Sequence, residues 1–185
     1  MRTELDRKFD ETLAAVIGPG GRLIIQRDEL GRAHVANFPG TLSLFFKTFC
    51  GLNRDVEATI AGDERLTFAD LDLWSDRLAK ALVTRGIRKG DRVGIAMRNC
   101  PAWVVGYMAA VKAGAIATLL NGWWESRELA HALEMTEPAL ILADAPRARR
   151  IAAAGDYQVV SLAIERPIGE ALAPLLDGVD DSAEL

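Results

Sequence analysis

The residues best placed to contact a ligand are the four at positions 121–124, Asn-Gly-Trp-Trp. They follow the apolar run Ile116–Leu120, which predicts a buried strand, and open α/β sheets bind ligands beyond the carboxyl ends of their strands. Two adjacent tryptophans in a loop are costly to expose to water. Trp123 and Trp124 therefore either pack on the domain or line an apolar pocket, and both alternatives stay open at this point.

Glycine-rich segments offer no convincing phosphate loop. The nearest match, Gly40 to Thr48, has Phe46 where a Walker loop needs a glycine directly before the lysine, and its spacing is too long. The run Gly18–Gly21 lacks Lys, Ser and Thr, which is typical of a plain turn. No G-x-G-x-x-G follows any predicted strand, so the sequence supplies no nucleotide-binding motif of this kind.

Two pairs of carboxylates have residue types suited to general acid–base chemistry, Asp70 with Asp72 and Asp180 with Asp181. The first pair opens a predicted helix, where negative charge is favourable in any case. The second pair lies in the polar C-terminal stretch. We expect both pairs to be solvated charge, because unpaired carboxylates are rarely buried.

The chain has only 2 histidines, and three of its arginines form a cluster. His131 has no second ligand spaced to join it, so we expect a structural role for it. Arg147, Arg149 and Arg150 gather on a short predicted helix, where a solvated face is expected and contact with an anion is the alternative. No catalytic constellation is complete, and the sequence assigns no catalytic, cofactor-binding or metal-binding residue.

The composition narrows the class of protein. The chain has 185 residues, 50% of them hydrophobic, and a formal net charge of −4, which excludes a disordered tail and disfavours nucleic-acid binding. Cys50 and Cys100 form no disulfide framework or metal-ligand spacing, so we expect a cytoplasmic protein. The apolar stretch Asn99–Trp124 carries Lys112 near its centre, which argues against a transmembrane segment, and no signal peptide is apparent.

The first 62 residues predict an N-terminal extension. Apolar residues at helical spacing predict a helix over 3–17, and a hairpin is expected from the apolar runs at 23–25 and 33–36. Thr41 caps a second predicted helix that runs through Phe49, and residues 56–60 predict a strand. We take residues 1–62 as this extension and residues 63–185 as an α/β part.

The α/β part opens with a strongly signalled helix. Thr67 is a good N-cap, and Asp70 completes a capping box three residues later. An apolar stripe at 3.6-residue spacing then predicts a helix that Gly86 ends, in the left-handed conformation that glycine adopts readily.

Strands and helices then alternate along the chain. Short apolar strands are predicted at 92–97, 116–120, 139–143 and 159–160, and the helices at 101–112, 126–137 and 146–154. Continuous apolar strands separated by helices indicate βαβ units, hence a mostly parallel sheet with helices on both faces. Residues 169–185 begin a helix and then become acidic and polar, which suggests an incomplete domain.

Several blocks of this sequence resemble, in order, the opening of the AMP-forming acyl-CoA synthetases, a superfamily that includes amino-acid adenylation domains and luciferases. The blocks are residues 66–71 (LTFADL), 78–82 (LAKAL), 85–93 (RGIRKGDRV), 99–103 (NCPAW) and 111–115 (VKAGA). Departures are mild: Phe68 stands for Tyr, and Asp70 and Ala102 each stand for Glu. Residues 121–129 and the hairpin-bearing extension look most like bacterial fatty-acid–CoA ligases.

The resemblance implies a partial N-terminal domain of the adenylate-forming fold. The family joins a carboxylic acid, here expected to be a fatty acid, to ATP with Mg²⁺ assistance and then to coenzyme A. Its phosphate loop, nucleotide-binding motifs and C-terminal lysine have no match in these 185 residues. We therefore carry over no catalytic residue, and expect none of these cofactors to bind this chain alone.

Three hypotheses follow from the resemblance. The first is an inactive portion of an acyl-CoA synthetase whose partner is the remainder of its own polypeptide. The second is a naturally short, non-catalytic binding or interaction module on the same scaffold. The third keeps the enzyme but makes its substrate an amino acid or an aryl acid. On the first hypothesis, apolar surface is left uncovered.

Overall fold

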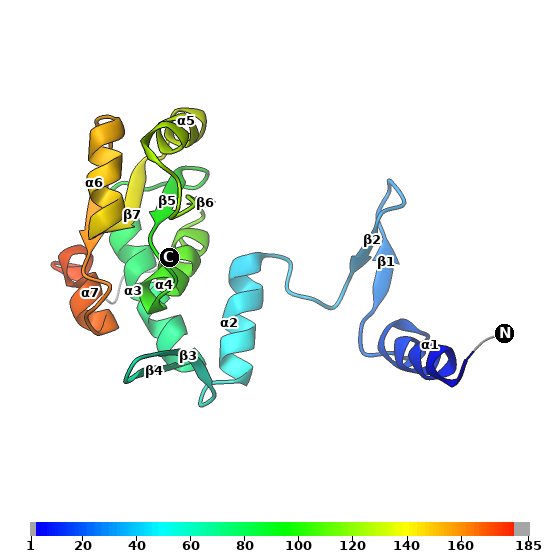
Figure 1. The fold of residues 1–185 in the computed structure, drawn as a ribbon. Coiled ribbons are helices and arrows are strands. Elements are labelled where there is room, and N and C mark those ends of the chain that lie inside the picture. The colour runs from blue at the N-terminus through cyan, green and yellow to red at the C-terminus, as the bar shows by residue number, and fades with distance from the viewer. Residues whose placement is uncertain (1–2, 180–185) are drawn as a thin grey trace. The chain divides into compact units, whose positions relative to one another are not determined.

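The computed structural model describes residues 3–179, and the chain divides into two compact units, Met1–Phe45 and Phe46–Leu185 (Figure 1). The division falls inside helix α2 (Leu42–Leu52), which Thr41 begins by accepting a hydrogen bond from the Leu44 N–H at 3.1 Å. The predicted second helix is thus confirmed. The division predicted between residues 62 and 63, which separates the N-terminal extension from the α/β part, stays a prediction.

The first unit contains the predicted helix and hairpin. Helix α1 (Glu4–Ile17) starts at a capping box in which the Thr3 hydroxyl accepts from the Asp6 N–H at 3.2 Å. Strands β1 (Ile25–Arg27) and β2 (Ala33–Val35) pair antiparallel. No residue of α1 is buried, so this unit has little core of its own.

The second unit begins with a hairpin that the sequence predicted only in part. Strand β3 (Glu57–Ala61) was expected, whereas β4 (Glu64–Thr67), which pairs with it antiparallel, was missed. Thr67 ends β4 and also caps α3 (Phe68–Thr84), since its hydroxyl accepts from the Asp70 N–H at 3.2 Å. The capping box is present as predicted, but Thr67 is also the last residue of β4, and that strand was not predicted.

A four-stranded parallel sheet forms the centre of the second unit. Its strands are β5 (Arg92–Ala96), β6 (Ile116–Leu119), β7 (Leu140–Asp144) and β8 (Val159–Leu162), in the order β6-β5-β7-β8. Every neighbouring pair in this sheet is parallel, as the βαβ pattern predicted. Connecting helices α4 (Pro101–Lys112), α5 (Ser126–Thr136) and α6 (Ala145–Ala154) lie between successive strands.

Helices cover both faces of the sheet (Figure 1). Side chains alternate between faces along each strand, so Leu140 and Leu142 join one core while Ile141 and Ala143 join the other. The first core contains residues of α3, α4 and α7 (Ile168–Leu176), and the second contains residues of α5 and α6. The fold class expected from the sequence is therefore confirmed.

The start of α5 differs from the prediction, whereas the burial of α4 agrees with it. Ser126 was expected to cap α5, but the preceding residue, Glu125, holds that position: its N–H donates to the Glu128 carboxylate at 3.0 Å. The predicted burial of α4 is confirmed, because seven of its residues are buried. Within residues 3–179, no helix is long and apolar enough to cross a membrane.

Candidate functional site

The carboxyl edge of the parallel sheet has a switch point between β5 and β7. The chain leaves β5 for β6 on one side and leaves β7 for β8 on the other, so the two connections diverge. Such a divergence opens a crevice where α/β proteins bind ligands. Here the segments beyond the strands are 97–100 after β5 and 120–124 after β6.

The side chain of Asp144 occupies this switch point and is almost fully buried, with 1% of its surface exposed. Its carboxylate accepts the Arg147 N–H at 3.0 Å, the Arg147 Nη1–H at 2.9 Å and the Arg98 N–H at 3.1 Å. The carboxylate thus caps α6 and ties the end of β7 to the segment after β5. These contacts engage both carboxylate oxygens and make Asp144 an anchor of the site.

A pocket lined by aromatic residues lies beside Asp144 and has a cavity volume of about 610 Å³. We call it the aromatic pocket; its lining residues are Met97, Arg98, Asn99, Trp103, Leu119, Leu120, Asn121, Gly122, Trp123, Trp124 and Arg147. The two alternatives for the tryptophans are both realised. Trp124 packs on the α5–α6 core while Trp123 stays 86% exposed, and both line the pocket.

The arginine cluster holds the tryptophan loop in place. Arg147 Nε donates to the Gly122 carbonyl at 3.1 Å, and Arg150 Nη1 donates to the carbonyls of Gly122 and Trp124 at 3.3 and 3.2 Å. Of the three arginines in the cluster, only Arg149 is exposed. The expected solvated face is therefore wrong for Arg147 and Arg150, whose donors bind backbone carbonyls.

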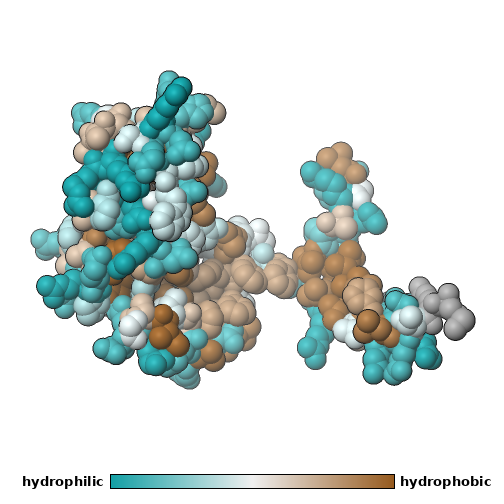
Figure 2. Space-filling view, in the orientation of Figure 1, coloured by the Kyte–Doolittle hydropathy of each residue, from teal (hydrophilic) through white to brown (hydrophobic). Residues whose placement is uncertain are grey.

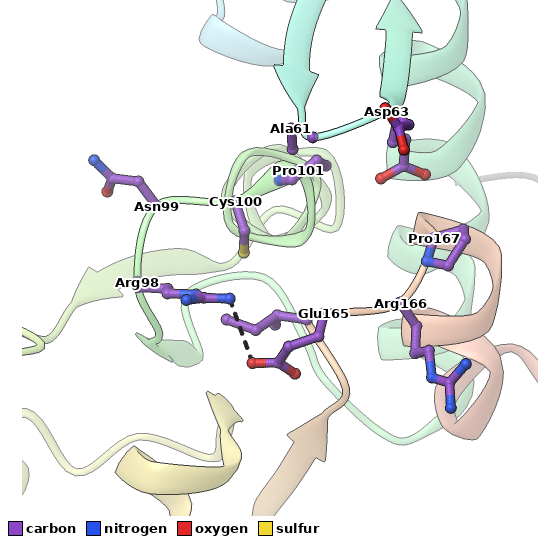
Figure 3. A pocket seen from close by; sticks show the side chains of 12 residues that line it. Ala61, Asp63, Arg98, Asn99, Cys100, Pro101, Glu165, Arg166 and Pro167 are labelled. Atoms are coloured by element: carbon purple, nitrogen blue, oxygen red, sulfur yellow. Dashed lines mark hydrogen bonds and ion pairs between the residues drawn. The ribbon is translucent and has the colours of Figure 1, made fainter.

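A second pocket of about 610 Å³ lies among the β3–β4 turn, the start of α4 and the segment before α7 (Figure 3). The Arg98 and Glu165 side chains point toward each other with Nη2 and Oε1 3.4 Å apart, and both side chains are exposed. Glu64 Oε1 accepts the Ile168 N–H at 2.7 Å and so secures one wall. Burial raises the pKa of the Cys100 thiol in this pocket, which disfavours a reactive thiolate.

The remaining candidates from the sequence are not gathered at either pocket. Asp70 completes the capping box of α3 as expected, because its Oδ2 accepts the Thr67 N–H at 2.8 Å. Asp72 is no solvated charge, because its Oδ1 lies 2.6 Å from Lys112 Nζ. His131 is exposed on α5. Residues 42–48 of the rejected phosphate loop are helical. The pair Asp180 and Asp181 lies outside the described residues.

Sequence reasoning missed the buried carboxylate at the switch point. A usable signal was present, since an Asp that precedes a proline at the first turn of a helix is a common N-cap. The contact with Arg98 had no such local signal. In the part of the chain that the structure describes, no three His, Cys, Asp or Glu residues gather to hold a metal ion.

Comparison with known proteins gives concordant matches. Residues 46–178 match the family described as AMP-binding enzyme. The medium/long-chain-fatty-acid–CoA ligase FadD6 of Mycobacterium tuberculosis is 37% identical over 94 residues, which are 51% of this chain and 16% of that protein. Acyl-CoA ligase SID4 of Ajellomyces capsulatus is 32% identical over 137 residues, which are 73% of this chain and 21% of that protein.

Among solved structures, a benzoate CoA ligase from Burkholderia xenovorans superposes with a TM-score of 0.69 at 17% identity. The match covers 79% of this chain and 30% of that one, and at this identity it shows the fold alone.

The matched part of this chain spans 16% of the length of FadD6 and 21% of the length of SID4, the two curated relatives named above.

Proposed function

The chain belongs to the AMP-binding enzyme family, and on that premise we propose that it forms part of an AMP-forming acyl-CoA ligase. The observation that carries the proposal is the family match over residues 46–178, which contains the whole parallel sheet. In this role the residues supply scaffold: the capped helix α3, the buried helix α4 and the first strands of the sheet. On this proposal, the protein acts in the cytoplasm.

A fatty acid is the substrate we propose for the whole enzyme. The name of FadD6 specifies medium- and long-chain fatty acids, and that protein is similar over 51% of this chain. An aryl acid, an alternative that the sequence left open, is the second candidate; a benzoate CoA ligase has this fold, but at 17% identity that match says nothing of the substrate. The aromatic pocket does not separate the two, because Trp123 and Trp124 offer apolar surface to either acyl group.

ATP, Mg²⁺ and coenzyme A are the cofactors that the family implies, and the described residues do not fit them. Near the switch point, Arg147 and Arg150 donate to Asp144 and to backbone carbonyls, and Arg98 Nη2 lies 3.4 Å from Glu165 Oε1. The described strands are followed by no glycine-rich phosphate loop, and among residues 3–179 no three His, Cys, Asp or Glu residues gather to hold Mg²⁺. We therefore propose that these cofactors bind elsewhere in the complete enzyme, and we derive no catalytic step through them.

The 185-residue chain by itself is proposed to be inactive. The test is ATP–pyrophosphate exchange with the purified chain, ATP, Mg²⁺ and either palmitate or benzoate. We expect no exchange above a blank without protein, because no glycine-rich phosphate loop follows a strand at the described sheet edge to stabilise the charge that develops on ATP. Robust exchange with either acid would show that the active groups are in this chain and would overturn the proposal.

The enzymatic role of the scaffold is tested by a chimera. Residues 46–178 replace the corresponding segment of FadD6, and formation of palmitoyl-CoA is measured. Activity in the chimera supports a scaffold role in an acyl-CoA ligase. A chimera that folds cooperatively but forms no acyl-CoA favours the alternative of a non-catalytic module.

A further inference from the structure

The helix that joins the two compact units packs through one narrow face. Only its second half, residues 46–52, belongs to the second unit, and we call this half the α2 strap. Phe46, Phe49 and Cys50 have the spacing that places side chains on one face of a helix. Helix α2 lies wholly within the described residues, and Cys50, with 1% of its surface exposed, is its one buried residue.

Much of the apolar surface of α2 stays open to water. Apolar side chains gather on the outside of this helix (Figure 2, brown). Leu42 and Leu44 are each at least half exposed, and Leu52 is 79% exposed. Since a segment with few buried contacts opens at low free energy, α2 is the helix of the second unit that separates most easily from its neighbours.

An ion cluster, rather than an apolar core, meets the α2 strap. The Nζ atom of Lys112 lies 5.9 Å from the centre of the Phe46 ring. It donates to Asp72 Oδ1 at 2.6 Å, to Asp76 Oδ1 at 2.7 Å and to the Asp72 carbonyl at 3.0 Å. These acceptors use all three hydrogens of the ammonium group, and the Lys112 side chain is only 4% exposed.

The thiol of Cys50 lies within the field of the same charges. Burial first, and then the charge of Asp72, raise the pKa of this thiol. Cys50 belongs to neither of the two apolar cores, so the packing of α2 accounts for its burial. A buried, protonated thiol reacts slowly with alkylating reagents. The reactivity of Cys50 therefore reports whether the α2 strap is docked.

The ion cluster favours two positions of the strap. In the docked position the Phe46 ring covers a desolvated ammonium group, and this contact is stabilising. In the open position water solvates one cation and two carboxylates, which makes the opening less costly than exposing an apolar core. Phe49 adds a ring contact with Phe68 at the start of α3, 5.2 Å between centroids.

We propose that the α2 strap opens and closes while the rest of the second unit stays folded, and that the Lys112 cation beneath the Phe46 ring holds it closed. Opening exposes Cys50 and converts residues 46–52 into linker. The connection to the first unit then lengthens from about 1.5 Å to as much as about 3.3 Å per residue. The proposal concerns the motion of this chain itself and does not depend on the proposed enzymatic function.

The experiment measures alkylation of the native 185-residue chain by iodoacetamide, with mass spectrometry of Cys50 and Cys100 separately. Phe46→Leu removes the ring from Lys112 and keeps an apolar side chain. We expect Cys50 to be alkylated about fivefold faster in this variant, because the rate follows the population of the open form. The rate at Cys100, which precedes α4, should stay unchanged.

Lys112→Met tests the cation itself. It should also speed the alkylation of Cys50, and adding Phe46→Leu to it should have little further effect, because the contact between the two groups is already lost. Cys100 distinguishes strap opening from unfolding of the whole unit, since global unfolding exposes both thiols. Phe9→Leu, the same substitution at an exposed position of α1, is the matched control and should leave both rates unchanged.

Four outcomes would overturn the proposal. The first is a Cys50 rate in Phe46→Leu equal to that of the unsubstituted chain, and the second is a rate at Cys100 that rises in step with Cys50. The third is an equal effect of Phe9→Leu. The fourth is a full additional effect of Phe46→Leu in the Lys112→Met chain, because it would show that the ring and the cation act independently.

Discussion

The buried carboxylate of Asp144, at the end of β7, accepts a hydrogen bond from the backbone N–H of Arg98 at 3.1 Å, although 46 residues separate the two in sequence. Arg98 lies just beyond β5, the strand beside β7. The contact therefore joins the two strand ends at the switch point. A crevice that other α/β proteins use for ligands is here spanned by the chain's own hydrogen bond.

Asp144→Ala should lower the free energy of unfolding by about 3 kcal/mol, because it removes the α6 cap and leaves the half-buried Arg147 unpaired. Asp144→Asn should cost less, about 1–2 kcal/mol, since asparagine still caps a helix. Urea unfolding of both variants checks this. Asp156→Ala, at an exposed aspartate, is the control, and an equal small loss in all three variants would contradict the anchoring role.

Lys112→Met should destabilise the chain by about 2 kcal/mol, because Lys112 Nζ lies 2.6 Å from Asp72 Oδ1 and 2.7 Å from Asp76 Oδ1. The lysine side chain is only 4% exposed, and its loss leaves two carboxylates facing each other. Arg65→Ala breaks an exposed ion pair with Glu57 and should cost less than about 1 kcal/mol. Chemical denaturation measures the free energy of unfolding of both variants. Equal losses in the two would contradict a larger contribution from the buried Lys112 than from the exposed Arg65.

Elements with local signals were predictable from the sequence. The capping box of Thr67 and Asp70 and the positive φ of Gly86 are each set within a few residues, so α3 and its end were placed correctly. Strand β4 was missed because its last residue is also the cap of α3. Glu125 was missed as the start of α5 because glutamate is an uncommon N-cap and Ser126 is a common one.

The site was less predictable, since its contacts join distant segments. Asp144 meets Arg98 across 46 residues, and Lys112 meets Asp72 across 40. The loop 121–124 was identified correctly as lying beyond a strand, because strand ends can be located from hydrophobic patterns. Arg147 and Arg150 bind backbone carbonyls of this loop from α6, and no local pattern encodes these contacts or which tryptophan packs and which stays exposed.

The free energy of unfolding should fall at alkaline pH through the two thiols. Burial raises the pKa of both Cys50 and Cys100 above the ordinary value of 9.0. Each thiol therefore contributes stability that is fully present below about pH 9 and is lost as the pH rises through the higher pKa of the folded state. The measurement compares the chain with a Cys50→Ala, Cys100→Ala double variant between about pH 8 and about pH 10.5. Parallel pH profiles would contradict the prediction, because the two proteins differ in these thiols alone.

Arg150→Ala should loosen the tryptophan loop without unfolding the domain. The variant removes the hydrogen bonds from Arg150 Nη1 to the carbonyls of Gly122 and Trp124, while Arg147 still holds Gly122. Amide exchange over 122–125 should quicken by about tenfold, since each lost bond to a charged donor weakens the closed loop. Acrylamide should also quench the tryptophan fluorescence more strongly. Arg149→Ala, one position away on the same helix but exposed, should change neither measurement, and matching effects from both variants would show that the arginine cluster acts only through its charge.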